Sequence, residues 1–231
     1  MECVSSKTAI LSNFHDAVPR KQSLNNDLVL TQRILPRFQY AKILSQSRTS
    51  AQPLPMPEPL QLLLDIIPTP IGSMTIAADP AGNLRLALFT EDEAVLTRQL
   101  RLQYGKTGFS VTRARNPHGL SDLIRRYFAG ELATIDTIPV ATGGTPFQQK
   151  VWQELRNIPC GKTTSYGELS RRIGHPTAVR AVGAANGDNP VAVIVPCHRV
   201  IGSNGSLTGY GGGIERKRWL LDHETRSTRL F

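Results

Sequence analysis

The sequence predicts an α+β protein in which a small antiparallel sheet with helices precedes a mostly helical domain. Three short runs with strand character follow one another between residues 60 and 90, separated by turns of a few residues, and such short loops favour antiparallel pairing. After residue 145, helix-capping residues and apolar residues at helical spacing recur instead. With 231 residues, of which 40% are hydrophobic, the chain has room for two small domains. We expect them at residues 59–144 and 145–231.

Residues 1–58 are predicted to lie outside both domains. Polar residues and short apolar patches mix there, and the segment ends with prolines at alternate positions, Pro53, Pro55, Pro57 and Pro59. Such a composition favours a disordered extension that ends in a stiff linker. A second hypothesis is that translation starts at Met56, where the globular pattern opens, which would place the preceding residues outside the native protein.

The first domain is predicted to contain four strands and two helices. A capping box of Thr90 and Glu93 starts the first helix, and Gly105 ends it. Apolar residues at helical spacing mark the second helix, which Gly130 closes. The predicted strands are 60–67, 73–78, 84–90 and 109–113. The first predicted helix runs from its cap at Thr90 to about Tyr104, and the second has an apolar face from Leu120 to Phe128. No residue of this domain is predicted to take part in chemistry.

The second domain is predicted to begin with three helices. Thr145 and Gln148 form a capping box around Pro146, and Ser165 and Glu168 form a second one. The expected helices run from 146 to 158, from 165 to 173 and from 177 to 187. Two short helices joined by a Gly-containing turn have the outline of a helix-turn-helix DNA-binding motif, although many small helical domains share that outline.

The stretch Val195–Val200, which reads Val-Pro-Cys-His-Arg-Val, carries the clearest chemical signal. It follows the apolar run 191–195, which predicts a buried strand that holds the Cys197 thiol in place. The thiolate is the effective nucleophile, and a neighbouring imidazole such as His198 is one of the few groups that generate it near neutral pH. Taken alone, a Cys-His pair is more often a buried structural cysteine beside an unrelated histidine. The surrounding residues favour the nucleophile.

Charge and cysteine content narrow the class of protein. The net charge of +9 and the pI of about 9.9 suggest a polyanionic partner, and residues 146–231 carry 12 Lys/Arg against 6 Asp/Glu. Cys3, Cys160 and Cys197 show no C-x-x-C spacing, which argues against a disulfide framework and a zinc cluster. No apolar run approaches the length of a membrane span. We expect a reduced, cytoplasmic protein with no membrane segment.

The helix predicted at 177–187 has one long side chain, Arg180, among alanines and glycines. Such a face can approach another surface closely. That surface is either a neighbouring helix or the minor groove of DNA, which is about 6 Å wide, where an arginine can enter the base stack. Spacing alone leaves both interpretations open.

Two further features follow the Cys-His pair. Tyr210–Gly213 reads Tyr-Gly-Gly-Gly and predicts a flexible loop whose bare backbone can approach a flat ligand. A last helix is expected from Ile214 to about Glu224. At the C-terminal end of that helix, the helix dipole disfavours a negative charge, so the Glu224 carboxylate would hold a proton more readily than usual and could act as a proton acceptor. The alternative interpretation is an exposed glutamate at a frayed helix end.

Together these residues resemble the O6-alkylguanine-DNA alkyltransferases, most closely the constitutive bacterial form, over about residues 60–231. The string Pro-Cys-His-Arg-Val at 196–200 is the signature of that family. Other family segments occur here in the same order and spacing: Tyr127–Gly130, Thr142–Phe147, Arg180–Gly183, Asn189–Pro190, Thr208–Tyr210 and Trp219–Glu224. The resemblance implies a ribonuclease H-like first domain and a second domain with a helix-turn-helix and an active-site cysteine.

The resemblance also implies roles for the matched catalytic residues. Cys197 accepts the alkyl group irreversibly. His198 accepts the proton of the thiol and passes charge through a water to Glu224. Asn189 lies in the hinge that orders the site and hydrogen-bonds near the thiol.

Further positions are implied to bind the substrate. Arg180 fills the gap left by the extruded nucleotide, and Tyr166 pushes on the adjoining phosphate. The pocket for the flipped base is implied to consist of Tyr210, the glycines Gly211, Gly212 and Gly213, and the backbone after Cys197. A hydrogen bond from Lys217 is implied to stabilise it.

The implied reaction is DNA repair by direct reversal of the damage, after the damaged base is flipped out of the duplex. The protein is implied to be a monomer, and each molecule to react once. The implied partner is double-stranded DNA that contains O6-alkylguanine or O4-alkylthymine, and no cofactor is implied. No Cys or His cluster occurs in residues 60–145, so we expect no metal. Some relatives carry a hydroxyl residue where this chain has Gly211, so we expect a less crowded pocket that tolerates alkyl groups larger than methyl.

Two other functions are weighed against this one. A helix-turn-helix protein that binds lesions without reacting is the main alternative, and the joint presence of Cys197, His198, Asn189 and Glu224 argues against it. A Cys-His hydrolase is the second, and the chain has no evident oxyanion loop. A methyl adduct on Cys197 after incubation with alkylated DNA would separate transfer from binding alone.

Overall fold

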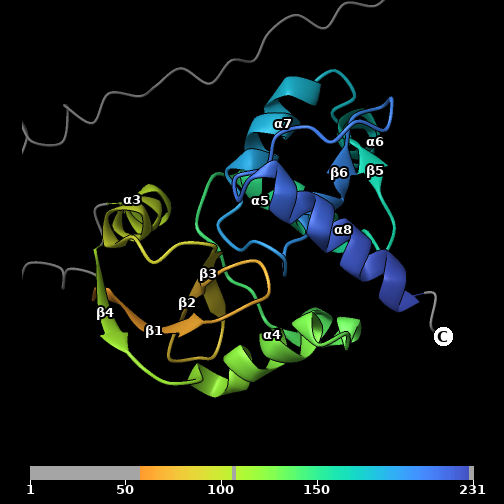
Figure 1. Ribbon diagram of the computed structural model, residues 1–231. Coiled ribbons are helices and arrows are strands. Elements are labelled where there is room, and N and C mark those ends of the chain that lie inside the picture. The colour runs from red at the N-terminus through yellow and green to blue at the C-terminus, as the bar shows by residue number, and fades with distance from the viewer. Residues whose placement is uncertain (1–57, 106–107, 229–231) are drawn as a thin grey trace, which may run out of the picture. The chain divides into compact units, whose positions relative to one another are not determined.

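The computed structural model describes residues 58–105 and 108–228, with side chains to residue 226 (Figure 1). These residues belong to one compact unit, Met56–Phe231. The expectations of disorder before residue 58 and of a start at Met56 concern residues outside the described ones. None of the described helices is both long and apolar enough to cross a membrane.

The first half of this unit contains a four-stranded sheet in the order β3-β2-β1-β4 (Figure 1). The strands are β1 (Leu60–Ile67), β2 (Met74–Ala78), β3 (Leu84–Leu88) and β4 (Phe109–Arg113). The predicted antiparallel pairing is confirmed for β1 with β2 and for β2 with β3. It is wrong for β4, which pairs in parallel with β1, with Leu60 opposite Phe109.

A crossover helix explains the mixed sheet. The helix α3 (Glu93–Tyr104) lies between β3 and β4 in the chain. A connection that contains a helix carries the chain back to the end of the sheet at which it started, so the next strand runs parallel to a neighbour. The short-loop rule that predicted antiparallel pairing applies only to the first three strands.

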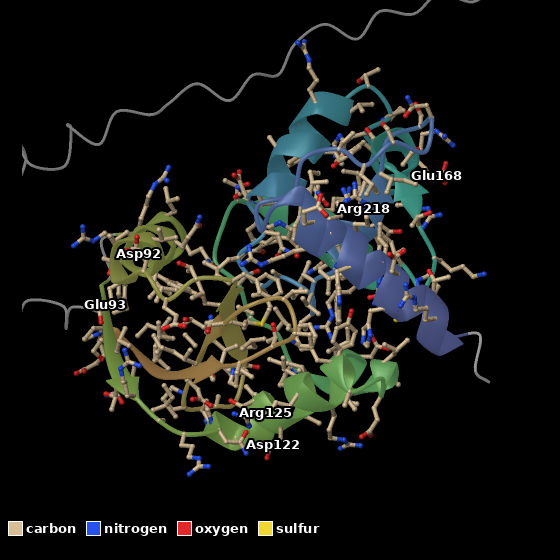
Figure 2. All side chains as sticks on the ribbon, in the orientation of Figure 1. Asp92, Glu93, Asp122, Arg125, Glu168 and Arg218 are labelled. Atoms are coloured by element: carbon tan, nitrogen blue, oxygen red, sulfur yellow. The ribbon has the colours of Figure 1, made fainter. Side chains whose placement is uncertain are left out.

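The start of α3 also differs from its prediction. Asp92, not Thr90, is the N-cap, and its carboxylate accepts hydrogen bonds from the backbone N–H groups of Ala94 and Val95. Figure 2 shows Asp92 and Glu93 at this end of the helix. Thr90 accepts a hydrogen bond from the backbone N–H of Asp92 instead. Both residue types cap helices well, so the sequence alone did not separate them.

The sheet is covered on both faces. Against one face, α3 contributes to an apolar cluster of Leu62, Leu64, Ala77, Leu86, Leu96 and Leu100. Against the other face lies α4 (Leu120–Phe128), which confirms the second predicted helix. Figure 2 shows Asp122 and Arg125 of α4 side by side, and their side chains form an ion pair at 2.6 Å. Short 3-10 turns, Pro117–Gly119 and Leu132–Thr137, precede and follow α4.

The second half is mainly helical, as predicted. The capping box of Thr145 and Gln148 around Pro146 is confirmed at the start of α5. The elements are α5 (Pro146–Arg156), β5 (Thr164–Ser165), α6 (Tyr166–Arg172), α7 (Val179–Gly187), the 3-10 turn η5 (Cys197–Arg199), β6 (Val200–Ile201) and α8 (Ile214–Thr228). The strands β5 and β6 pair in parallel.

The main apolar cluster joins the two halves. It contains Met74 and Ile76 of β2 together with Trp152 of α5 and Leu220 of α8. The indole N–H of Trp152 donates to the backbone oxygen of Ala185 at 2.8 Å, which fastens α5 to α7. The helices that carry the predicted site residues are therefore held against a core that includes the sheet.

Candidate active site

The segment that leads to Cys197 is a buried turn. The predicted strand at 191–195 is wrong: the backbone N–H of Val195 bonds to the oxygen of Val191 at 3.0 Å, and Val193 adopts a left-handed φ of 74°. One bridge joins the segment to β3, through the N–H of Ala192 and the oxygen of Ala87 at 2.8 Å. A buried turn and a buried strand produce the same run of apolar residues, and periodicity cannot tell them apart.

Asn189 holds this turn and the thiol together. Its side-chain Nδ2 donates to the Cys197 Sγ at 3.1 Å and to the backbone oxygen of Val195 at 2.7 Å, while its Oδ1 accepts from the N–H of Val191 at 3.0 Å. Burial raises the pKa of the Cys197 thiol, and the Asn189 hydrogen bond and the charge of Lys217 oppose that rise. An N–H that points at the sulfur stabilises the thiolate.

The His198 imidazole contacts Glu224 directly. Its Nε2 lies 2.8 Å from the Glu224 Oε1, so the expectation of a water between these two residues is wrong. An ionised carboxylate only accepts hydrogen bonds, so the Nε2 carries the hydrogen and the Nδ1 has a free lone pair. The Nδ1 is buried and has no hydrogen-bond partner within the described part of the chain. Burial lowers the pKa of His198, although Glu224 pulls it upward, so the imidazole is a neutral base.

The Glu224 carboxylate is buried and fully hydrogen-bonded. Arg199 donates to both of its oxygens, from Nη2 at 2.8 Å and from Nε at 3.0 Å. The Tyr127 hydroxyl donates to Oε1 at 2.9 Å, and the backbone N–H of Gly161 donates to Oε2 at 3.1 Å. Burial would raise the pKa of this carboxyl, but His198 and Arg199 outweigh burial and hold the pKa below its ordinary value.

Two expectations about Glu224 are therefore corrected. The last helix, α8, continues to Thr228, so Glu224 lies inside it rather than at its end, and the carboxyl is ionised rather than prone to keep a proton. The side chain is also fully buried, which excludes an exposed glutamate on a frayed end. Spacing within one helix could not reveal the arginine that neutralises it.

Tyr127 and Arg199 were not predicted as site residues. Arg199 stands in the signature string, but no role was assigned to it. Tyr127 opens the family segment Tyr127–Gly130 but has no expected role, and it reaches Glu224 across 97 positions of sequence. No sequence signal separates a core tyrosine from one whose hydroxyl has a buried partner.

A cavity of about 170 Å³ opens beside the Cys197 thiol. It is smaller than typical ligand pockets, which measure roughly 300–1,000 Å³, and it suits a small planar group. Its lining includes the predicted residues Asn189, Tyr210, Gly211 and Gly212 together with residues of the first half: Leu88, Phe89, Thr90, Val95 and Gln99.

The glycine loop shapes this cavity. A Cβ atom at Gly212 would lie 2.7 Å from the Tyr210 ring, whereas one at Gly211 would meet nothing closer than 3.8 Å. The Tyr210 hydroxyl is buried, with no hydrogen-bond partner among residues 58–105 and 108–226. Burial raises its pKa well above the ordinary value. It is a protonated donor beside the thiol.

Lys217 fastens the chain that follows the Cys-His pair. Its Nζ is buried and donates to the backbone oxygens of Val200 at 2.6 Å and Thr208 at 3.2 Å. The hydroxyl of Thr208 in turn donates to the hydroxyl of Tyr166, the first residue of α6, at 3.0 Å. Burial lowers the pKa of Lys217 and the charge of Cys197 raises it.

The helices α6 and α7 expose three arginines and several small residues. Arg180 is exposed near the start of α7, and the exposed positions that follow it are Ala181, Ala184 and Gly187. Arg171 and Arg172 are exposed at the end of α6. Tyr166 and Arg180 thus lie on the helix pair, whereas the other predicted site residues surround the cavity, the thiol and the Glu224 network. Among the described residues, no group of three or more His, Cys, Asp or Glu side chains could hold a metal ion.

Comparison with known proteins agrees with this geometry. The family described as "6-O-methylguanine DNA methyltransferase, DNA binding domain" matches residues 146–226. The methylated-DNA–protein-cysteine methyltransferase of Shigella flexneri is 52% identical over 165 residues, which cover 71% of this chain and 96% of that protein. This chain belongs to the methylated-DNA–protein-cysteine methyltransferase family.

Solved structures agree with this membership of the methyltransferase family. The Mycobacterium tuberculosis O6-methylguanine methyltransferase has a TM-score of 0.60 and 42% identity, over 72% of this chain and 94% of that one. A second structure of the M. tuberculosis protein, in complex with DNA, has a TM-score of 0.59 and 43% identity, over 73% of this chain and 94% of that one.

Proposed function

We propose that this protein repairs DNA by direct reversal, transferring the alkyl group of O6-alkylguanine, and of O4-alkylthymine, irreversibly to Cys197. The observation that carries the proposal is a buried thiol that accepts a hydrogen bond from Asn189 at 3.1 Å, beside a small cavity, in a member of this family. The protein is a methylated-DNA–protein-cysteine methyltransferase that acts once per molecule.

The chemical step needs a proton acceptor and a donor. His198 takes the proton of the Cys197 thiol on Nδ1 by way of a water molecule, and the ionised Glu224 stabilises the resulting imidazolium through Nε2. The sulfur then attacks the alkyl carbon, so a carbon–sulfur bond forms as the carbon–oxygen bond breaks. The leaving guanine anion accepts a hydrogen bond or a proton from the Tyr210 hydroxyl. The product is a thioether, which is a poor leaving group, so the protein is consumed.

The remaining proposed roles concern Asn189, Lys217 and the loop. Asn189 directs its N–H at the sulfur and orders the turn before it. Lys217 fixes the backbone at Val200 and Thr208, and the bare glycines Gly211 and Gly212 leave room for the base next to Tyr210.

Duplex DNA is proposed to bind at α6 and α7. The exposed residues that follow Arg180 on α7 are alanines and a glycine. Because these side chains are small, the helix backbone can lie close to a DNA groove. An alkylated O6 atom is inaccessible within the base stack, and extrusion of the base costs a few kcal/mol. Arg180 fills the vacated place in the stack, and Tyr166 contacts the adjoining phosphate.

We also propose that the chain has two domains, residues 59–144 and 145–231. We further propose that the protein is a monomer and acts in the cytoplasm. A nucleophilic thiol has to stay reduced until it meets the lesion, and the cytoplasm keeps thiols reduced.

Intact-protein mass spectrometry tests the proposed function. Incubation with a duplex that contains O6-methylguanine is expected to add about 14 Da, one methyl in place of one hydrogen, to Cys197. The Cys197→Ser variant is the control and should gain no mass. Binding of the lesion without an adduct would support a non-reacting lesion-binding protein instead.

A further inference from the structure

One side chain of α8 joins the glycine loop, Tyr210–Gly213, to the first half of the molecule. The Nε of Arg216 donates to the backbone oxygen of Ile71 at 2.8 Å, and its Nη1 donates to the backbone oxygen of Gly212 at 2.7 Å. Ile71 lies in the connection between β1 and β2. A single guanidinium therefore holds two backbone segments that are far apart in the sequence.

The same guanidinium packs on Phe89, a residue of the cavity wall. Its central carbon lies 5.2 Å from the centroid of the Phe89 ring, which is within the range of a cation–π contact. Phe89 and Gly212 both line the cavity beside Cys197, whereas Arg216 is not among the described residues that line it. Arg216 thus supports, from outside the cavity, two parts of the wall that belong to different halves of the molecule.

Glycines leave the space that this bridge requires. A Cβ atom at Gly72 would lie 3.1 Å from the Arg216 Nη2, and the φ of Gly72 is 109°, a value that favours glycine. A Cβ atom at Gly212 would lie 3.3 Å from the Phe89 ring. The glycine loop therefore lies directly against Phe89, with the guanidinium bonded to both sides of the contact.

The loop has little order of its own. Three successive glycines follow Tyr210, and glycine loses more conformational freedom on ordering than any other residue. An arginine is suited to order such a loop, because its planar fork directs several N–H groups at fixed angles while its flat face stacks on a ring. A lysine ammonium is a point charge on a flexible stem and cannot reproduce that set of contacts.

We propose that Arg216 is a positioning residue that keeps the glycine loop closed against the first half of the molecule, and that alkyl transfer from DNA requires this bridge. The inference rests on the proposed alkyl transfer. Arg216 acts through Gly212 and Phe89 and is not itself a catalytic residue. Without the bridge, the loop opens and only a fraction of the molecules have a complete cavity, so transfer slows by that fraction.

The charge of Arg216 makes a second contribution that the test has to separate from the bridge. That charge opposes the rise in the pKa of the Tyr210 hydroxyl that burial causes. Arg216→Lys keeps a positive charge and loses the fork that spans both carbonyls, whereas Arg216→Met loses both.

The test compares two methyl donors that react with the same sulfur. One is a duplex that contains O6-methylguanine, and the other is methyl iodide, a small donor that needs no closed loop; peptide mass spectrometry measures the adduct on Cys197 from each. In Arg216→Met, the single-turnover rate from the duplex is expected to fall by at least about tenfold, and the rate from methyl iodide should not fall. Arg216→Lys should show the same pattern with a smaller fall, and serves if the methionine variant does not fold.

Hydrogen exchange reports the order of the loop directly. The backbone N–H of Gly213 donates to the oxygen of Tyr210 at 2.9 Å. The loop amides of Arg216→Met should exchange about tenfold faster than those of the unmodified protein, while the amides of β2 keep their rates. Arg218→Met is the matched control, because Arg218 is an exposed residue of the same helix that pairs with Glu215 at 2.6 Å (Figure 2). This variant should leave exchange and both methyl rates unchanged.

The outcomes separate the inference from the function on which it rests. A duplex rate within about twofold of the unmodified protein in both Arg216 variants would overturn the bridge and leave alkyl transfer standing; so would a full rate in the lysine variant alone, which would assign the effect to charge. An equal loss of both methyl rates would assign Arg216 a general structural role, and weaker binding of an undamaged duplex would make it a DNA contact; both overturn the inference. If the unmodified protein accepts a methyl from methyl iodide but none from the duplex, the proposed function itself fails.

Discussion

At the scale of single residues, the Cys197 sulfur lies under opposing influences. Burial favours the neutral thiol, whereas the Asn189 N–H and the charge of Lys217 favour the thiolate. Removal of the Asn189 donor should shift this balance towards the thiol.

We therefore expect Asn189→Asp to slow alkyl transfer at neutral pH. The substitution replaces an N–H that points at the sulfur with a negative oxygen, which raises the pKa of Cys197. Each unit of pKa lowers the thiolate fraction about tenfold, so the rate should fall by at least that factor and recover as the pH rises. Stopped-flow measurements of the single-turnover rate between pH 6 and 9 would check this. A rate reduced equally at every pH would show that Asn189 acts only on structure.

The two glycines after Tyr210 should respond differently to substitution. A side chain at Gly211 finds room, whereas one at Gly212 collides with the Tyr210 ring. Gly211→Ser should therefore fold normally and narrow the pocket, lowering the rate on O6-ethylguanine relative to O6-methylguanine. Gly212→Ser should displace Tyr210 and slow both reactions. A strong methyl preference already present in the unmodified protein would contradict the expected tolerance of larger groups.

At the scale of elements, the contact between α4 and α8 joins the sheet side of the molecule to the catalytic network. Tyr127 of α4 donates to Glu224 of α8, and its own backbone oxygen lies 2.8 Å from the His223 Nε2. The Trp219 and His223 rings of α8 stack on each other, with centroids 4.7 Å apart. The proposed proton relay therefore includes a contact from a helix of the first half.

The Tyr127→Phe variant tests this dependence. Loss of one hydrogen bond to a buried carboxylate should lower the free energy of unfolding by about 1–3 kcal/mol. The carboxylate then shares its charge with fewer donors, interacts more strongly with the His198 proton, and should move the acid limb of the rate profile to higher pH. Tyr104→Phe removes a hydroxyl that donates to Ala141, away from Glu224, and should leave the profile unchanged. Identical profiles for both variants would refute a role for Tyr127 in the relay.

Most elements could be predicted from the sequence, because caps and periodicity are local signals. The bounds of β1, the apolar face of α4 and the capping box of α5 follow from neighbouring residues alone. The parallel pairing of β4 could not be predicted from loop length, because it depends on where α3 returns the chain. The turn before Cys197 has the same apolar sequence pattern as a buried strand. No Gly or Asn in the sequence marks the end of α8.

The site was partly predictable for a related reason. Cys197, His198, Asn189 and Tyr210 are close in sequence or belong to a characteristic string, so a motif finds them. Long-range partners carry no such signal. Arg199 pairs with Glu224, and Tyr127 reaches Glu224 from another helix, only once the chain has folded.

At the scale of the whole molecule, buried titratable groups couple stability to pH. The folded state lowers the pKa of His198 and of Glu224 below their ordinary values of 6.5 and 4.5. The unfolded chain therefore binds protons more readily, and the free energy of unfolding falls as the pH drops. The His198 contribution is present above about pH 6.5 and is lost below it, and that of Glu224 is lost below about pH 4.5.

Urea denaturation between pH 8 and pH 4 should show this decline. The His198→Gln variant, which has no imidazole to protonate, should lose the part of the decline that begins near pH 6.5. His175→Gln, at an exposed position before α7, should retain it. A denaturation midpoint that stays constant down to pH 4 would contradict the coupling.

The cavity wall contributed by Phe89, Thr90, Val95 and Gln99 limits how this protein can be engineered. A fusion protein that contained only residues 146–226, the part that matches the DNA-binding domain family, would lack one wall of the cavity beside Cys197. It would also lack the Tyr127 hydroxyl. It would also expose to water the apolar side chains that now cover β2 and β3. A transplantable repair module must therefore carry the sheet and α4 with it.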